Sequence, residues 1–232
     1  LMIYNTDLDA LCVYNGTAWD CMDAQSLFNK TFMCDDVLRD FRDGKSYATV
    51  QIGPQCWMAE NLNVGTRIDG SNEQTNTAGT IEKYCYDDNT SNCDIYGGLY
   101  QWNEMMQYVT TEGVQGICPD GWHIPTDGEW TTLTTFLGGI DKGGEMKEEG
   151  TNHWNTPNTG ATNSSGFTAL PGGARYNTSV LFHYLGDYGH WWSSSEFIEA
   201  SSWNQKLSFD HVYVHRNGNQ KTLGFSVRCL KD

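Results

Sequence analysis

The sequence predicts an α+β fold with long loops, braced by disulfide bonds. Aromatic residues make up 13% of the 232 residues and glycines number 25, whereas charged residues reach only 19%, a balance typical of loop-rich β structure. The eight cysteines form an even set, as expected for four disulfide bonds in an oxidising compartment. Two segments show helical periodicity, and the C-terminal residues alternate as antiparallel strands do.

The cysteines contain no CxxC pair, which argues against a zinc ribbon. The sequence alone leaves about a hundred pairings open. Proximity favours Cys12–Cys21 and Cys85–Cys93, each of which encloses a short, turn-rich loop. The remaining cysteines must then make longer links; they are Cys34, Cys56, Cys118 and Cys229.

The acidic composition excludes two classes of partner. The formal net charge is −15 and the isoelectric point is about 4.6, whereas nucleic acids and anionic membrane surfaces attract basic patches. A net charge far from zero keeps a secreted protein soluble. No apolar run approaches the roughly 18–20 residues that span a bilayer, so we expect no membrane insertion.

The chain is predicted to contain two parts. Residues 1–34 form an appendage, a β-hairpin with strands at 2–4 and 11–14 and a turn signal at Asn15-Gly16, followed by an acidic linker with a short helix. Residues 35–232 form the main domain. The chain begins inside strand-like sequence without a signal peptide, so we expect it to be part of a longer chain.

Two helices are expected in the main domain. The first covers residues 98–108 and places four apolar residues on one face: Leu99, Trp102, Met105 and Met106. The second begins at Thr126, which forms a capping box with Glu129. Its apolar stripe consists of Trp130, Leu133, Phe136 and Leu137. Residues 138–190 are expected to be loops.

Apolar and polar residues alternate in the C-terminal segment, as in an antiparallel sheet with one buried and one solvent-exposed face. The residues expected to point inward are Trp203, Leu207, Phe209, Val212 and Val214. Asn217-Gly218 is expected to turn the chain, and Phe225 and Val227 to lie on a closing strand. Of the adjacent indoles of Trp191 and Trp192, one is expected in the core and the other near the surface.

Six collinear motifs carry a resemblance to a known family. They lie at residues 41–53 (FRDGKSYATVQIG), at Gln55 with 57–63 (WMAENLN), and at 96–100 (YGGLY), 118–126 (CPDGWHIPT), 191–195 (WWSSS) and 224–229 (GFSVRC). These motifs resemble the Fibrobacter succinogenes major paralogous domain, which is similar to the formylglycine-generating and C-type-lectin-like folds. The resemblance implies a C-type-lectin-like domain over residues 35–232. It also implies a Cys118–Cys229 disulfide, whose loop of about 110 residues is worth roughly 4–5 kcal/mol in the chain-entropy model.

The C-terminal motifs also resemble variable proteins of diversity-generating retroelements, in which scattered outward positions vary on a fixed lectin-like scaffold. Outward positions here are rich in the small polar and aromatic residues that suit a selectable binding surface. The predicted ligand-binding residues are Tyr184, Asp187, Tyr188, His190, Phe197, Glu199, Asn204, Lys206, Ser208, Asp210, His211, Tyr213, His215, Arg216, Asn217 and Asn219.

Catalysis is not expected. The formylglycine-generating relatives use a reactive cysteine pair in the C-terminal half, whereas Cys229 is the one cysteine after Cys118 and is expected to be structural. His123 has no acid or nucleophile beside it in sequence, so a buried imidazole bonded to backbone is the expected state. Glu60 is expected to be a buried carboxylate that accepts backbone amides.

No metal or other cofactor is predicted. His211 and His215 share a strand face, but no third ligand is placed to complete a zinc site with them. Calcium-dependent sugar binding would need an acid in the Trp203-Asn204-Gln205 strand and a proline flanked by a carboxylate–amide pair, and we find neither. An acidic loop at 87–94 offers oxygen ligands, but a solvated loop is the simpler interpretation.

The sequence therefore predicts a non-enzymatic binding domain, located outside the cell, on a cell surface or on a virion. Its expected partner is a protein or glycan receptor on a cell surface. The alternative is a structural cell-envelope protein of the same family without a dedicated ligand. A carbohydrate-binding lectin that stacks sugars on aromatic rings is a further alternative.

Overall fold

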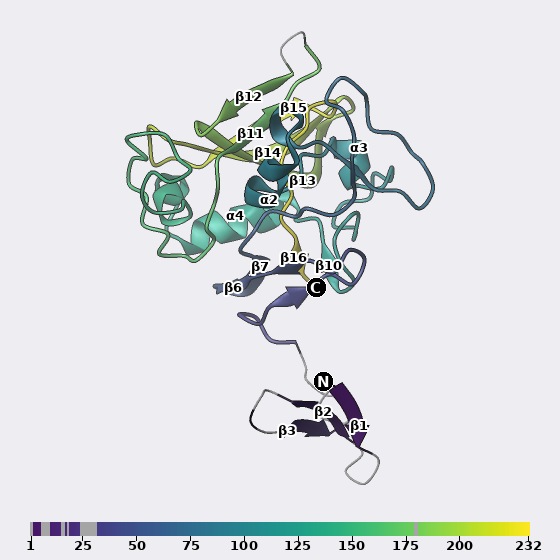
Figure 1. Cartoon of the computed structure of the whole chain (residues 1–232). Coiled ribbons are helices and arrows are strands. Elements are labelled where there is room, and N and C mark those ends of the chain that lie inside the picture. Colours follow the sequence, from purple (N-terminus) through teal and green to yellow (C-terminus); the bar gives the residue numbers. More distant parts are fainter. Residues whose placement is uncertain (1, 6–9, 15–16, 18, 24–31, 179–180) are drawn as a thin grey trace. The chain divides into compact units, whose positions relative to one another are not determined.

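The computed structural model describes residues 2–5, 10–14, 17, 19–23, 32–178 and 181–232 (Figure 1). The chain divides into two compact units, Leu1–Met33 and Cys34–Asp232. The smaller unit is an antiparallel sheet of strands β1 (Met2–Asn5), β2 (Ala10–Tyr14) and β3 (Trp19–Asp23). It thus has one strand more than the predicted hairpin. The predicted turn at 15–16 and the linker residues 24–31 lie outside the described residues.

A four-stranded sheet in the larger unit brings the two ends of that unit together. Its order is β10-β16-β7-β6, from β10 (Trp122–His123), β16 (Leu230–Lys231), β7 (Gln55–Met58) and β6 (Thr49–Ile52). All four residues of β7 are buried, and the strand is paired on both sides. Two short pairs flank this sheet in the chain order: β4 (Leu38–Arg39) with β5 (Ser46–Tyr47), and β8 (Thr66–Arg67) parallel to β9 (Glu82–Lys83).

The helices agree only in part with the sequence pattern. Helix α4 (Asp127–Phe136) begins at the predicted capping box, in which the Thr126 hydroxyl accepts from the Glu129 amide and the Glu129 carboxylate accepts from the Thr126 amide. Phe136, however, is 60% exposed, so its place in the apolar stripe was wrong. Helix α2 (Thr90–Tyr96) and the 3₁₀ turns η1 (Tyr86–Asp88) and η2 (Ile140–Glu145) were not predicted.

The predicted first helix is much shorter than expected. Helix α3 covers only Trp102–Met105, because the backbone becomes left-handed at Gln107 (φ 52°) and Tyr108 (φ 60°), a region that continues no α-helix. The predicted apolar face is nevertheless buried: Leu99, Trp102, Met105 and Met106 are each at most 1% exposed.

The C-terminal sheet is larger than the sequence pattern indicated. It consists of β13 (Tyr188–Ile198), β14 (Ser201–Ser208) and β15 (His215–Gln220), in that order. A hairpin of β11 (Gly172–Arg175) and β12 (Phe182–Leu185) packs beside β13, in the segment that was expected to be loops. In Figure 1 these strands gather on one side of the larger unit, the four-stranded sheet lies on the other, and α4 lies between them.

The predicted turn at Asn217-Gly218 is wrong, because both residues lie inside β15. Gly218 pairs with Trp203 in the β14–β15 register. A Cβ at this position would come within 2.3 Å of the Phe197 ring. The glycine therefore serves the close approach of Phe197 rather than a reversal of the chain.

The main core packs aromatic and aliphatic side chains between the two sheets and α4. Its members are Ile52, Trp57, Trp130, Leu133, Met146, Trp154, Phe167, Ala169, Trp191, Leu207, Val214 and Leu230. Trp191 and Trp192 are both 0% exposed, so the prediction that one of them reaches the surface is wrong. Their indole N–H groups donate to Asn61 Oδ1 (2.8 Å) and to the Tyr100 carbonyl (2.8 Å).

Three disulfides brace the larger unit: Cys34–Cys56, Cys85–Cys93 and Cys118–Cys229. The predicted Cys85–Cys93 and Cys118–Cys229 bonds are confirmed. Cys12 lies opposite Cys21 in the β2–β3 register, but the side chain of Cys21 lies outside the described atoms, so that bond stays a prediction. Disulfides of this number indicate folding in an oxidising compartment.

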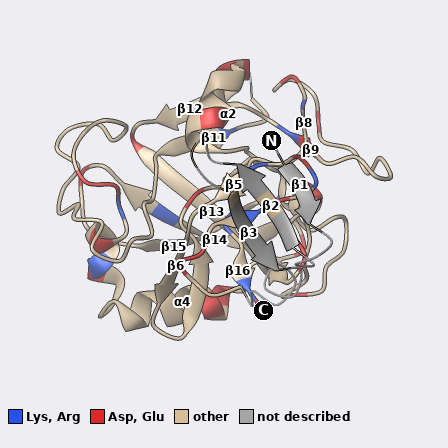
Figure 2. Ribbon diagram, turned by 60° about the horizontal axis from the view of Figure 1, so that its bottom comes forward, with Lys and Arg blue, Asp and Glu red and all other residues tan. Residues whose placement is uncertain are grey.

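Acidic residues are spread over many loops of the ribbon, as Figure 2 shows in red, in keeping with the net charge of −15. None of the described helices combines the length and apolar character that crossing a bilayer requires.

Candidate binding face on the C-terminal sheet

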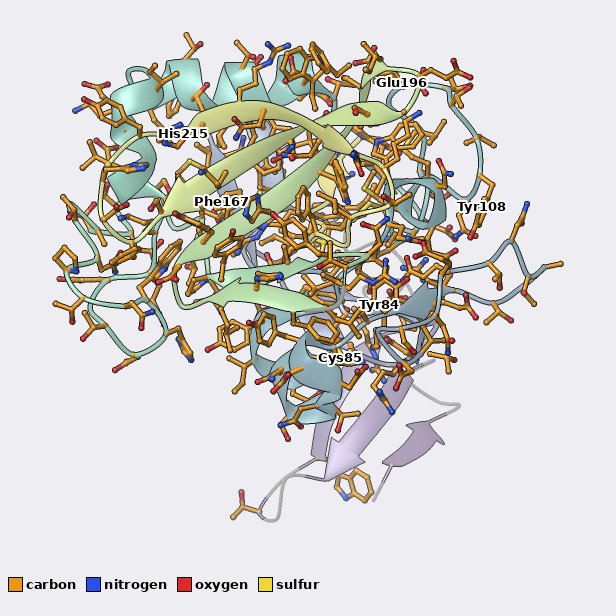
Figure 3. All side chains as sticks on the ribbon, turned by 90° about the horizontal axis from the view of Figure 1, so that it is seen from above. Tyr84, Cys85, Tyr108, Phe167, Glu196 and His215 are labelled. Carbon is orange, nitrogen blue, oxygen red and sulfur yellow. A yellow bond between two sulfur atoms is a disulfide. The ribbon has the colours of Figure 1, made fainter. Side chains whose placement is uncertain are left out.

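The strand register decides which predicted residues share a face, because directly paired residues point to the same side of a sheet. His190, Lys206 and His215 form one row across the three strands, and Trp192, Asn204 and Asn217 form the next. The opposite face carries Leu207 and Trp191, which belong to the core. Figure 3 views the sheet with His215 and Glu196 toward opposite ends.

The predicted ligand-binding residues differ widely in exposure. The exposed ones are Tyr184, Phe197, Glu199, Asp210, Tyr213 and Arg216. The half-buried ones are Asp187, Tyr188, Lys206, His211, His215, Asn217 and Asn219. Three are buried, contrary to the prediction: His190 is 5% exposed, Asn204 0% and Ser208 1%.

Contacts with neighbouring segments account for the burial of His190 and Asn204. Residues 224–226 run beside β13, where Ser226 bridges to Trp191, and the Phe225 ring stacks on the His190 imidazole at 4.5 Å. Asn204 lies in the central strand β14 opposite Asn217 of β15, and its amide donates to the Asn217 carbonyl (2.9 Å). Only the part of the face toward β15 remains open to solvent.

Arg216 and Phe197 also differ from the prediction, because both pack on Trp203, on the opposite face from His215. The Arg216 guanidinium stacks on the Trp203 ring at 3.3 Å and donates to both carboxylate oxygens of Asp127, at 2.7 and 2.9 Å. Phe197 packs on the same indole at 4.4 Å between ring centroids. These contacts tie β15 to the first residue of α4, so Arg216 acts mainly as a structural bridge.

A hollow of about 410 Å³ opens on the outer face beside the β11–β12 hairpin. It is lined by Tyr176, Tyr184, Tyr188, His190, Lys206, Asn217, Gly218 and Asn219. Six of these eight belong to the predicted ligand-binding set, and its volume is in the range of small-ligand sites. We call it the tyrosine hollow.

His190 lies at the inner end of the tyrosine hollow. Burial, helped by the nearby Lys206 charge and opposed by the Asn204 amide, lowers its pKa to about 3. The imidazole is therefore neutral at physiological pH, with one nitrogen as donor and one as acceptor. Among the described residues, neither nitrogen has a hydrogen-bond partner of ordinary geometry. A weak contact with Asn204 would still leave one nitrogen unsatisfied.

A second cluster lies at the turn between β14 and β15. The Nε2 atoms of His211 and His215 are 3.1 Å apart, and Asp210 Oδ1 is 3.7 Å from His211 Nε2. Burial lowers the pKa of His215, and Lys206 and His211 lower it further. Within the described part of the chain, no group of three metal-binding side chains converges here or elsewhere.

Two residues of the acidic loop at 87–94 are engaged with the protein rather than free to bind calcium. Asp88 Oδ1 accepts from the Gly70 amide (2.8 Å) and from Arg67 (3.3 Å), and Asn89 caps helix α2. The Thr156–Pro157 bond is cis and is flanked by Asn155 and Asn158 rather than by a carboxylate. Both amides donate within the protein, Asn155 to Asp187 and Asn158 to backbone carbonyls.

The two candidate catalytic residues differ from expectation. His123 is held by side chains, not backbone: Nδ1 lies 2.7 Å from Asp232 Oδ1 and Nε2 lies 3.1 Å from Glu129 Oε1. The hydrogen bond that His123 donates to the Glu129 carboxylate raises the pKa of the imidazole, although burial opposes this. Glu60 is exposed rather than buried, and accepts from the Ala48 amide at 2.6 Å.

Sequence reasoning missed Tyr176, which lies just after β11 and packs its ring against Tyr184 at 6.1 Å. The residue falls in the segment that was expected to be loops, far from the alternating strands. A run of closely spaced tyrosines and histidines (Tyr176, His183, Tyr184, Tyr188, His190) was the signal that could have found it.

The fold and the outer face of β13–β15 together define the class of protein. It is a disulfide-braced α+β domain with a polar, aromatic surface on a rigid sheet. The model of the Fibrobacter succinogenes major domain matches residues 50–231. The chain therefore belongs to the Fibrobacter succinogenes major domain family. No curated protein and no solved structure matches it.

Proposed function

We propose that this chain is a non-enzymatic binding module with a C-type-lectin-like fold, which engages a protein or glycan receptor through the outer face of β13–β15. The observation that carries the proposal is the tyrosine hollow. It brings tyrosines, asparagines, a lysine and a neutral histidine from four strands and the end of β11 into one concave surface. Concave sites with a few convergent polar groups are the usual form of binding sites.

The support under this face favours binding without rearrangement. Leu207 and Trp191 lie on the opposite side of the same strands and are at most 1% exposed. The Cys118–Cys229 bond holds the segment that follows the sheet. A surface that is ordered before binding loses less conformational entropy when the partner docks.

The sulfur chemistry supports a non-catalytic role. Cys229 is fully buried and bonded to Cys118, so it offers no thiolate for the chemistry of the formylglycine-generating relatives. His123, the other candidate, is enclosed by two carboxylates and a helix cap, which suits a structural role.

We further propose that the chain is the variable protein of a diversity-generating retroelement, displayed on a phage particle or a cell surface. Sequencing the same locus in sibling isolates tests this. Substitutions confined to the outer face, with an adenine-biased template repeat nearby, are expected. Uniform drift over the whole domain would favour the structural cell-envelope protein instead.

A receptor screen with the whole chain tests the binding role directly. Tyr213 is 49% exposed and its ring contacts that of His211, which in turn contacts His215. We expect the double substitution Tyr213→Ala and His215→Ala to weaken receptor binding by about tenfold or more, as loss of an interface hot spot does. The matched control is Ile95→Ala in α2, which is 47% exposed and should leave binding unchanged. Equal loss in both variants would contradict the assignment of this face.

A further inference from the structure

The tyrosine hollow contains more polar chemistry than the fold requires. Among the described residues, the hydroxyls of Tyr176, Tyr184 and Tyr188 form no hydrogen bond, and their rings form a chain of contacts at 6.1 and 4.9 Å. Together with the unpartnered nitrogen of His190, they offer several neutral donors and acceptors beside aromatic faces. An apolar ligand would leave these groups unsatisfied, at a cost in affinity.

Buried, unpaired polar groups need an explanation in a native structure. His190 is 5% exposed, lines the hollow and stacks on Phe225. Phenylalanine or leucine would fill this place in the fold without leaving nitrogens unpaired. The imidazole therefore points to a ligand that supplies a hydroxyl, since one hydroxyl both donates and accepts a hydrogen bond.

Lys206 adds a positive charge to the rim of the hollow. Its Nζ lies 4.5 Å from the centre of the Tyr188 ring. No described carboxylate forms an ion pair with it, and Asp210 is the one acid whose charge acts on its pKa, which burial lowers. An unpaired, half-buried lysine is unusual in a chain with a net charge of −15. It favours a ligand that brings its own negative group.

Tyr184 supports a functional interpretation of the hollow. Its backbone lies in the left-handed region, at φ 70°, which a bulky residue adopts only at a cost. The ring is nevertheless 42% exposed, so burial in the core does not repay the strain. The conformation places the ring between those of Tyr176 and Tyr188.

From these observations we propose that the tyrosine hollow binds a saccharide that carries a carboxylate, such as a hexuronate. Sugar hydroxyls would meet His190 and the asparagine amides, the ring would lie on a tyrosine face, and the carboxylate would pair with Lys206. The inference rests on the proposed binding function and names the ligand class of that face. An acidic peptide would also form an ion pair with Lys206, but it offers fewer hydroxyls for the neutral groups of the hollow. Binding of such a peptide in place of the sugars is the competing outcome of the test.

The test compares two probes that differ at one carbon. Glucuronate and glucose share a pyranose ring, and only glucuronate carries a carboxylate at C6. Binding to the whole chain is measured from shifts in two-dimensional amide NMR spectra. We expect glucuronate to bind with about tenfold or greater preference over glucose, the usual worth of a charge-assisted hydrogen bond. The shifts should map to β12, β13 and β15.

Three variants separate the parts of the site. Lys206→Gln should reduce glucuronate affinity to that of glucose and leave glucose binding unchanged. His190→Phe keeps an aromatic ring on Phe225 and should weaken both sugars, and Tyr184→Ala should do the same. The matched control is Lys142→Gln, a lysine in η2 that lines a different hollow and should change neither affinity. Thermal unfolding of each variant shows whether the fold is kept.

Failure of this inference is distinguishable from failure of the proposed function. If neither sugar binds, or if a glutamate-rich peptide binds in their place, the saccharide proposal is overturned. If the receptor screen still identifies a partner that Tyr213→Ala with His215→Ala weakens, the binding function stands without it. If Lys206→Gln and Lys142→Gln lower glucuronate affinity equally, the attraction is nonspecific and the site is wrong.

Discussion

Arg228 is a buried cation that joins segments far apart in the chain. It is 1% exposed, donates to Asn61 Oδ1 (2.9 Å) and to the carbonyls of Phe167 and Thr168, and lies 4.0 Å from the Phe167 ring centre. Replacing it with alanine leaves buried acceptors unpaired and opens a cavity. We expect Arg228→Ala to lower the free energy of unfolding by about 3–5 kcal/mol, measured by urea denaturation.

Two further variants make this prediction specific. Arg228→Lys should recover little, because one ammonium group cannot reproduce the fixed geometry of a guanidinium. Arg67 is exposed and pairs with Asp88 at 3.3 Å, so Arg67→Ala should cost at most about 1 kcal/mol. Similar losses for Arg228→Ala and Arg67→Ala would contradict the structural role of Arg228.

At the scale of residues, the sequence predicted which face of the sheet a side chain points to better than it predicted whether that side chain is buried. The alternation of residues along β14 correctly placed Asn204, Lys206 and Ser208 on one face, because successive side chains of a strand point to opposite faces. Whether that face is wet depends on what lies over it. The cover over His190 comes from Phe225, 35 residues later in the chain (225 − 190), and no local pattern reports such a contact.

At the scale of elements, His123 links strand β10 to helix α4 and to the end of β16. The hydrogen bond that its imidazole donates to Glu129, helped by the one to Asp232, raises the pKa of His123 above the usual 6.5. The folded state therefore binds this proton more tightly than the unfolded state does. The stabilisation is complete below about pH 6.5 and is lost as the pH rises through the raised pKa. We expect His123→Gln to remove this loss, measured as unfolding free energy from pH 6 to 9.

His190 provides an internal comparison for that measurement. Its pKa is lowered to about 3, first by burial, so the unfolded state binds its proton more tightly. His190 therefore makes the free energy of unfolding increase as the pH rises from about 3 to 6.5. This pH range lies below the range in which His123 acts. If the wild-type and His123→Gln curves run parallel between pH 6 and 9, the two carboxylates do not act on His123 as inferred.

Helices and strands whose residues carry a recognisable local pattern were predicted well. Those that depend on contacts with distant parts of the chain were not. The start of α4 follows from Thr126 and Glu129 alone, since a capping box is complete within four residues. Strand β13 has no comparable signal. Seven consecutive residues of it are buried, because both of its faces are covered, and a strand of that kind shows no alternation.

At the scale of the whole molecule, helices and strands are short and loops are long. Disulfide bonds therefore help to hold distant segments of the chain together. Collinear motifs were sufficient to place the Cys118–Cys229 bond, and proximity to place Cys85–Cys93. Neither signal points to Cys34–Cys56 directly, because its partners close no short loop and belong to no shared motif. This bond, which the structure contains, is nevertheless the one pairing left once the other six cysteines are paired as predicted.

The three disulfides should contribute to stability in the order of the loops that they close. Their sequence separations are 111 for Cys118–Cys229, 22 for Cys34–Cys56 and 8 for Cys85–Cys93. The chain-entropy relation then gives losses of about 5, 3 and 2.5 kcal/mol when each pair is replaced by alanines. Urea unfolding of the three double variants, followed by tryptophan fluorescence, measures these losses. If Cys85–Cys93 proved the costliest to remove, the bonds would act through native packing around α2 rather than by restricting the unfolded chain.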